Sequence, residues 1–98
     1  MPVRRVVIGI CMALAAFRAS AAEAPPGASS CLGCHTASAA VETPVPPLTG
    51  LPAPRTAEAM RAFRAGTRPD TIMPRLAKGF SDDEIAALAA WYAAQPAP

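Results

Sequence analysis

Prolines limit what this chain can fold into more than any other feature of its sequence. The chain has 98 residues and 12 prolines, and five of these prolines fall within residues 43–54 (TPVPPLTGLPAP). Each proline removes a backbone donor and fixes φ, so long helices and interior strands are excluded where prolines cluster. We therefore expect residues 43–54 to form a stiff, extended loop, with short helices on either side.

The first two expected helices are short. The alanine-rich stretch 31–40 can form one or two helical turns, which Ser29 or Ser30 can cap. Thr56 can cap a second helix of about ten residues that ends before Gly66, a residue type that favours helix C-termini.

The last third of the chain is expected to contain one more helix. Residues 67–79 are expected to be irregular, because Pro69 and Pro74 interrupt them. Residues 81–84 (SDDE) form a capping box, and the helix that follows should run to about Ala94 with its apolar residues at helical spacing. No stretch shows a strand pattern, so the expected fold class is all-α.

Large apolar side chains are scarce in this chain. Hydrophobic residues make up 52% of it, but 24 of them are alanines. A small chain with so little core material usually needs a disulfide, a metal, a cofactor or a partner to fold.

Residues 1–22 have the layout of a secretory signal peptide. Two arginines precede an uninterrupted apolar run at residues 6–17, and small residues follow. The run is too short to cross about 30 Å of hydrocarbon as a helix, which argues against an uncleaved anchor. We expect cleavage and a protein that works in a bacterial periplasm, with no membrane span in the remaining chain.

The remaining chain divides into a flexible segment, residues 23–30, and a single domain, residues 31–98. Of the nine basic residues three lie in the signal, so residues 23–98 hold six basic and seven acidic groups. The basic residues form no run and aromatic residues are few, so nucleic-acid binding is not expected.

The motif that carries chemistry is Cys-x-x-Cys-His at residues 31–35. This spacing is typical of c-type haem attachment: Cys31 and Cys34 would bond the two vinyl groups of one porphyrin, and His35 would be the proximal iron ligand.

Other readings of the two cysteines fit less well. A structural zinc site needs four ligands, whereas residues 23–98 hold two cysteines and one histidine. A thioredoxin-like pair follows a strand, and a secreted disulfide scaffold has more than one pair. We therefore infer one covalent haem c.

Two methionines compete for the sixth position on the iron. Met60 lies within an expected helix, three residues before Phe63, which favours a place in the core. Met73 lies in the irregular segment, where Pro74 should bias it toward an extended backbone that could direct its side chain at the iron. Met73 is therefore the expected ligand. With both axial positions filled, the remaining chemistry is one-electron transfer.

General features of haem sites predict roles for residues around the iron ligands. The second ring nitrogen of a ligating histidine usually donates to a fixed acceptor, and the carbonyl of Pro46 or Pro47 is the natural candidate here. Leu48 would then pack on the porphyrin.

Four residues further along the chain have expected roles outside the iron coordination. Arg75 and Lys78 could pair with haem propionates, form part of a docking surface, or be solvated charges. Trp91 and Tyr92 are expected to pack between helices rather than relay electrons.

These motifs resemble those of class I c-type cytochromes. The resemblance covers residues 31–95, with CLGCH, Pro46-Pro47-Leu48, the methionine loop and the closing segment 88–92 (LAAWY). It implies three to five short helices around one haem, with the last helix crossing the one that bears the cysteines.

Residues 63–66 (FRAG) and 71–81 (TIMPRLAKGFS) are further similar to the cytochrome subunit of flavocytochrome c sulfide dehydrogenase. That resemblance implies an FAD-containing partner subunit that oxidises sulfide, and electrons passed on to a soluble or membrane-bound acceptor. The alternatives are a monohaem cytochrome that serves another periplasmic dehydrogenase or oxidase, and a haem-based gas sensor.

Overall fold

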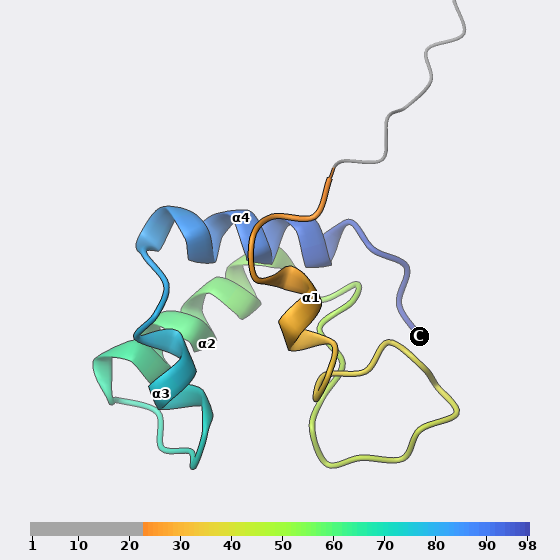
Figure 1. Ribbon diagram of the computed structural model, residues 1–98, viewed down its shortest axis with the longest axis horizontal. Helices are drawn as coiled ribbons and strands as arrows, with labels where there is room; N and C mark the ends of the chain where they lie inside the picture. Colours follow the sequence, from red (N-terminus) through yellow and green to blue (C-terminus); the bar gives the residue numbers. More distant parts are fainter. Residues whose placement is uncertain (1–22) are drawn as a thin grey trace, which may run out of the picture.

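The computed structural model describes residues 23–98, and this part of the chain is all-helical, with no strand (Figure 1). The helices are α1 (Ala28–Cys31), α2 (Ala53–Ala65), α3 (Met73–Ala77) and α4 (Asp82–Ala93). The expected all-α class is confirmed. The expected signal peptide lies outside the described residues. No helix among residues 23–98 has both the length and the apolar character needed to cross a bilayer.

Helix α4 begins at the capping box that the sequence predicts. The Ser81 hydroxyl accepts the N–H of Glu84 at 3.2 Å, and the Glu84 carboxylate accepts the N–H of Ser81 at 3.1 Å. The second of these bonds favours the ionised carboxylate and so lowers the pKa of Glu84. The helix ends at Ala93, one residue before the predicted end.

Helix α2 ends as predicted but begins earlier. Gly66 follows it with a φ of 77°, the left-handed conformation that glycine adopts without strain. The prediction that Thr56 caps the helix is wrong: Pro52 occupies the N-cap, Pro54 lies in the first turn, and Thr56 is buried inside the helix. Proline is tolerated in a first turn because the backbone N–H groups there have no partner within the helix.

Helix α3 lies in a segment that was expected to be irregular. Met73 is its first residue, so the expected extended backbone at Met73 is wrong. Pro74 stands in the first turn, where its missing N–H costs nothing.

Helix α1 precedes the stretch in which it was predicted. It covers Ala28–Cys31, and neither Ser29 nor Ser30 caps it; the N-cap is Gly27, with a φ of 88°. A Cβ on Gly27 would lie 3.0 Å from Cε1 of Phe80. Glycine is therefore needed here both for its backbone conformation and for the close approach of the Phe80 ring.

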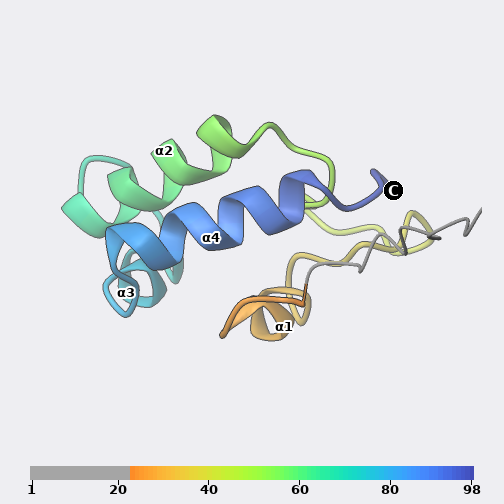
Figure 2. The same cartoon turned by 90° about the horizontal axis from the view of Figure 1, so that it is seen from above.

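Helix α4 runs alongside α2 (Figure 2) and supplies residues to two small hydrophobic clusters. In one cluster Ile85 and Ala89 meet Ala57 of α2, with Met60 packed against them. In the other, Leu88 and Tyr92 meet Ala28 of α1, with Cys31, Leu48, Phe80 and Trp91 around them. The last helix therefore packs against the cysteine-bearing one, as the resemblance to class I c-type cytochromes implied.

Tyr92 joins three parts of the chain. Its hydroxyl donates to the Ala28 carbonyl of α1, and its own carbonyl accepts the N–H of Gly50 at 3.0 Å. The ring of Trp91 meets the ring of Tyr92 edge to face, with centroids 4.9 Å apart. The expected packing role of both residues is confirmed. Burial, followed by the nearby Cys31 thiol, raises the pKa of Tyr92 to about 12.

We predict that Tyr92→Phe destabilises the protein by about 1–3 kcal/mol, because the buried Ala28 carbonyl loses its donor. The fold favours the neutral phenol, whereas an unfolded tyrosine ionises near pH 10. The contribution of this phenol to the free energy of unfolding is therefore complete below about pH 10 and declines as the pH rises toward 12. The Tyr92→Phe variant should lack this decline.

Urea unfolding at neutral and alkaline pH measures both effects. Ser29→Ala is the control, since that exposed hydroxyl on α1 has no partner, and it should change stability by less than about 0.5 kcal/mol. Equal stability of Tyr92→Phe and the unsubstituted protein would contradict the assigned hydrogen bond.

Candidate haem attachment site

The Cys-x-x-Cys-His motif occupies the end of α1 and the tight turn that follows it. Cys31 is the last residue of α1, and its carbonyl accepts the N–H of His35 at 2.8 Å and the N–H of Cys34 at 3.2 Å. These bonds hold the two cysteines and the histidine within a little more than one helical turn. Both thiols are free.

The His35 ring is fixed by the proline-rich loop. Its Nδ1 lies 2.6 Å from the Pro46 carbonyl oxygen. Since a carbonyl can only accept, Nδ1 is the nitrogen that donates, so in the neutral form of the ring Nε2 is the nitrogen without a proton. This contact was expected with Pro46 or Pro47, and the structure has it at Pro46. An imidazole in this tautomer is suited to bind a metal ion through Nε2.

The segment 36–52 that provides the Pro46 carbonyl contains local turns and is held against α4 near its end. The hydroxyls of Thr36 and Thr43 accept the N–H groups two residues further on, at 3.1 and 3.2 Å. Leu48 packs against the cluster around Tyr92, and the N–H of Gly50 is bound to the Tyr92 carbonyl. Gly50 has a φ of 77°, and a Cβ there would lie 2.8 Å from that of Ala97.

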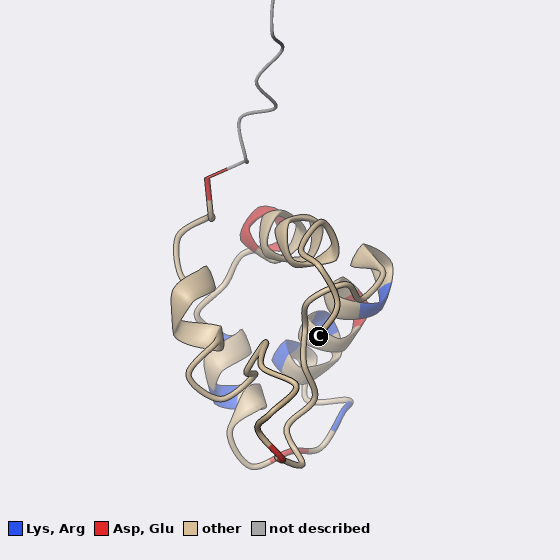
Figure 3. Cartoon of the chain, turned by 90° about the vertical axis from the view of Figure 1, so that its right-hand side faces the viewer, with Lys and Arg blue, Asp and Glu red and all other residues tan. Residues whose placement is uncertain are grey.

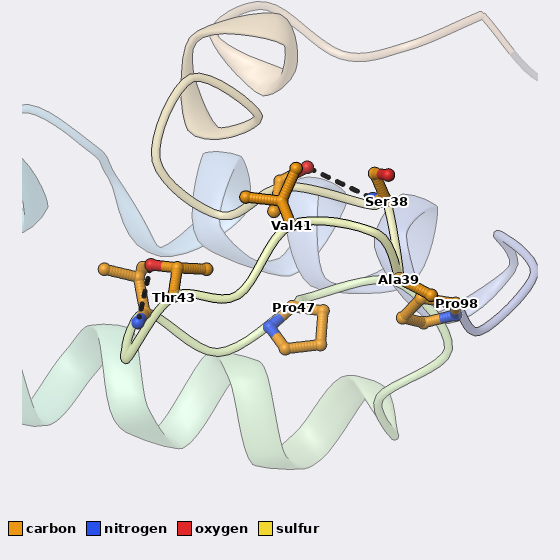
Figure 4. Close-up of a pocket in the computed structure, with 8 residues that line it drawn as sticks. Ser38, Ala39, Val41, Thr43, Pro47 and Pro98 are labelled. Carbon is orange, nitrogen blue, oxygen red and sulfur yellow. Dashed lines mark hydrogen bonds between the residues drawn. The ribbon is translucent and has the colours of Figure 1, made fainter.

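The same segment encloses a pocket of about 190 Å³ (Figure 4). Its lining combines hydroxyl, methyl and proline groups, with Pro98 at one side. Ligand pockets usually have a volume of about 300–1,000 Å³, so this hollow is too small for a porphyrin. It is a gap left where the loop folds back on itself.

The two candidate methionines differ in their surroundings. Met60 packs against Ala57, Ile85 and Ala89 between α2 and α4, which confirms its expected place in the core. Met73 is partly exposed at the start of α3, and its N–H donates to the Asp70 carboxylate at 3.3 Å. Met73 is therefore the methionine that remains available to a bound group. The sequence reasoning missed Asp70, which fixes the start of α3.

Among residues 23–98 the exposed large hydrophobic side chains come from two places. Leu32 (37% exposed) lies within the cysteine motif and Val41 (53%) on the loop after it; Ile72 (57%) and Leu76 (53%) flank Met73. Full exposure of such a side chain costs about 1.5–3 kcal/mol relative to burial, so these partly exposed side chains cost roughly half of that each. A flat apolar macrocycle held by the motif and reached by Met73 would cover Leu32, Ile72 and Leu76, so these residues fit a haem; Val41 lines the small pocket of the loop instead.

Two free thiols at this spacing, a histidine presenting Nε2 and an all-helical fold define a c-type haem domain. Comparison with known proteins agrees. Residues 27–91 match the family model described as cytochrome C oxidase, cbb3-type, subunit III. The chain belongs to this cytochrome c family, and its cofactor is covalently bound haem c.

Two curated relatives are also similar to this chain. The thiosulfate dehydrogenase electron acceptor of Thiomonas intermedia (strain K12) is 35% identical over 107 aligned residues, covering 100% of this chain and 49% of the relative. The protein of the same name from Stutzerimonas stutzeri (strain A1501) is 38% identical over 77 residues, covering 76% of this chain and 36% of the relative. This chain thus spans half or less of the length of these relatives.

We predict that Cys31 and Cys34 are the two attachment points. Haem should stay with the denatured wild-type polypeptide in acidified organic solvent, whereas the Cys31→Ala/Cys34→Ala double variant should release it, because no thioether can form.

The mass of the polypeptide and the haem content of the solvent phase measure this outcome, and neither requires the variant to fold. Ser30→Ala, next to the motif, is the control and should retain its haem. Haem extracted from the wild-type chain, or retained by the double variant, would disprove the assignment.

Proposed function

We propose that this chain is an electron-transfer cytochrome domain, with His35 and Met73 as the axial ligands of its haem iron. The observation that carries the proposal is the contact of His35 Nδ1 with the Pro46 carbonyl, which leaves Nε2 as the ring nitrogen that can bind a metal ion, in the same motif as two free thiols. Bound haem supplies a one-electron redox centre. With a histidine and a methionine in both axial positions, no site would be open to a substrate.

The residues of the chain have separate roles in this function. Cys31 and Cys34 keep the cofactor attached, and the Pro46 carbonyl fixes the orientation and raises the basicity of His35. Leu48, packed beside Cys31 and Tyr92, would meet the porphyrin edge. The apolar side chains on the motif, its loop and α3 would exclude water from the iron, which affects the reduction potential.

The electron donor that the comparisons favour is a dehydrogenase that oxidises an inorganic sulfur compound. Both relatives are named as electron acceptors of thiosulfate dehydrogenase. The resemblance of residues 71–81 to the cytochrome subunit of a flavoprotein sulfide dehydrogenase supports sulfide as the second candidate substrate of the partner. We propose thiosulfate first, because those relatives are similar over most or all of this chain.

We further propose that the protein acts in the periplasm. Residues 1–22 would direct its export as a cleaved signal peptide, and covalent attachment of haem c would follow there. N-terminal sequencing of the protein from its native host should find a chain that begins near residue 23, and an intact Met1 would contradict export by cleavage.

We predict that Met73→Leu abolishes the methionine-to-iron charge-transfer band of the ferric protein and lowers its reduction potential, because the thioether ligand is lost. Met60→Leu is the matched control: it makes the same change in the core, where leucine is a close replacement, and should keep the band.

Absorption spectroscopy and a redox titration of both variants test the ligand. Loss of the band in Met60→Leu alone would mean that Met60 is the ligand. Rapid binding of carbon monoxide to the untreated ferrous protein would instead favour a gas sensor over an electron carrier.

The donor is tested by purification from the native host, followed by addition of thiosulfate or sulfide to the fractions. Haem reduction that depends on thiosulfate supports the first candidate. Reduction that depends on sulfide, together with a co-eluting flavin-containing subunit, selects the second. A lone protein that neither compound reduces in any fraction would disprove both.

A further inference from the structure

The six basic residues among residues 23–98 fall into two groups. All of them lie between positions 55 and 78, on α2, α3 and the segment between them (Figure 3). Half of them are exposed and form no ion pair within this part of the chain: Arg55, Arg75 and Lys78. The other half contact carboxylate, carbonyl or aromatic groups of the protein: Arg61, Arg64 and Arg68. The second group therefore has a role inside the fold.

Arg64, in the last turn of α2, bonds to two groups at the start of α4. One guanidinium nitrogen donates to the Phe80 carbonyl at 3.1 Å, and the other pairs with the Asp82 carboxylate. The Arg64 side chain is 30% exposed, against 47% for Arg61, which lies 3.6 Å from the same carboxylate. Arg64 is the main reason that the pKa of Asp82 is lowered. Because the guanidinium is a rigid fork, one side chain fixes both groups.

These two bonds close the base of a loop. Residues 66–81 connect α2 to α4, and α3, which begins at Met73, lies within this segment. Arg64 and Phe80 are 16 positions apart, so the bond between them brings the two ends of the segment together. The ring of Phe80 packs against both hydrophobic clusters, so Arg64 is tied to a residue that is anchored in the core. Joining the ends of a loop removes many of its open conformations.

Few buried contacts hold Met73 itself in place. Helix α3 packs against α2, but Ala77 is the only buried residue among its five. The Met73 N–H is bound to the Asp70 carboxylate at 3.3 Å, and this contact lies within the segment 66–81. It therefore does not tie the methionine to the rest of the fold, as the link at the base of the segment does.

We propose that Arg64 is a positioning residue for Met73: by closing the segment 66–81 at its base, it keeps the methionine thioether within reach of the iron. The proposal rests on the axial ligand proposed above. Without Arg64 the segment would open more often, and the sixth position would be vacant in a larger fraction of the molecules. The apparent affinity of an external ligand rises in proportion to that fraction.

Titration of the ferric holoprotein with imidazole measures this fraction. An imidazole nitrogen replaces the Met73 sulfur on the iron without a change of oxidation state, and the methionine-to-iron charge-transfer band disappears. Arg64→Leu, which removes the donors and the charge but suits a helix, should bind imidazole about tenfold more tightly than the wild-type protein. A variant that is less stable to urea but binds imidazole as the wild type does would show a purely structural role and overturn the proposal.

Arg61→Leu is the matched control. It removes the same kind of cation from the same carboxylate, one turn earlier on α2, but no bond to the backbone of the segment. It should change the imidazole affinity by less than about twofold, because exposed ion pairs contribute little. If Arg61→Leu had as large an effect as Arg64→Leu, the charge near Asp82 would be responsible and the proposal would be wrong.

A second variant, Arg64→Lys, keeps the test decisive if Arg64→Leu does not fold into a holoprotein. Lysine keeps the charge but lacks the planar fork that reaches two acceptors. At neutral pH it should bind imidazole at least about threefold more tightly than the wild-type protein. Wild-type affinity in this variant would mean that charge alone suffices, which would contradict the proposed link to Phe80.

The Met73→Leu background separates this proposal from the ligand assignment on which it rests. Met73→Leu alone should bind imidazole more tightly than the wild-type protein, because no thioether competes; an unchanged affinity would mean that Met73 is not the ligand. Adding Arg64→Leu to Met73→Leu should change the affinity by less than about twofold. An effect as large as in the wild-type background would mean that Arg64 does not act through Met73, and the positioning role would be disproved.

Discussion

The arrangement of this small domain depends on the position of Tyr92. Its hydroxyl holds α1 through the Ala28 carbonyl, and its own carbonyl holds the proline-rich loop through Gly50. One and two turns earlier, Ala89 and Ile85 fix the same helix to α2. Tyr92 thus helps to position the cysteines through its side-chain hydroxyl and the carbonyl that orients His35 through its backbone carbonyl. Some 60 positions separate Tyr92 from Ala28 in the chain.

The parts of the fold that the sequence predicted are those set by local chemistry. The capping box at Ser81 and the glycine at position 66 act within a few residues, and the structure has both. A contact of His35 with the carbonyl of Pro46 or Pro47 was also predicted, because a ligating histidine usually donates to a fixed backbone acceptor, and the structure has it at Pro46. The cofactor followed from the spacing of two thiols and the only histidine.

The parts that were predicted wrongly are set by tertiary contacts or by prolines in first turns. Helix α1 lies before position 32 because Gly27 closes against Phe80, a contact 53 residues apart that no local pattern announces. Helices α2 and α3 both carry a proline in the first turn, Pro54 and Pro74, at positions where we expected a loop. The division of six similar cations into paired and unpaired ones likewise required the positions of Asp82 and Phe63.

The two proposed iron ligands stand on parts of the fold that are held by different contacts. His35 belongs to a region tied to α4 by Tyr92, Leu48 and Gly50, whereas α3, which begins at Met73, packs against α2. Because α4 packs against both α1 and α2, it sets how far His35 and Met73 lie from each other. A substitution at the contact of α4 with α2 would therefore reach the iron through the spacing of its two ligands, without touching either one.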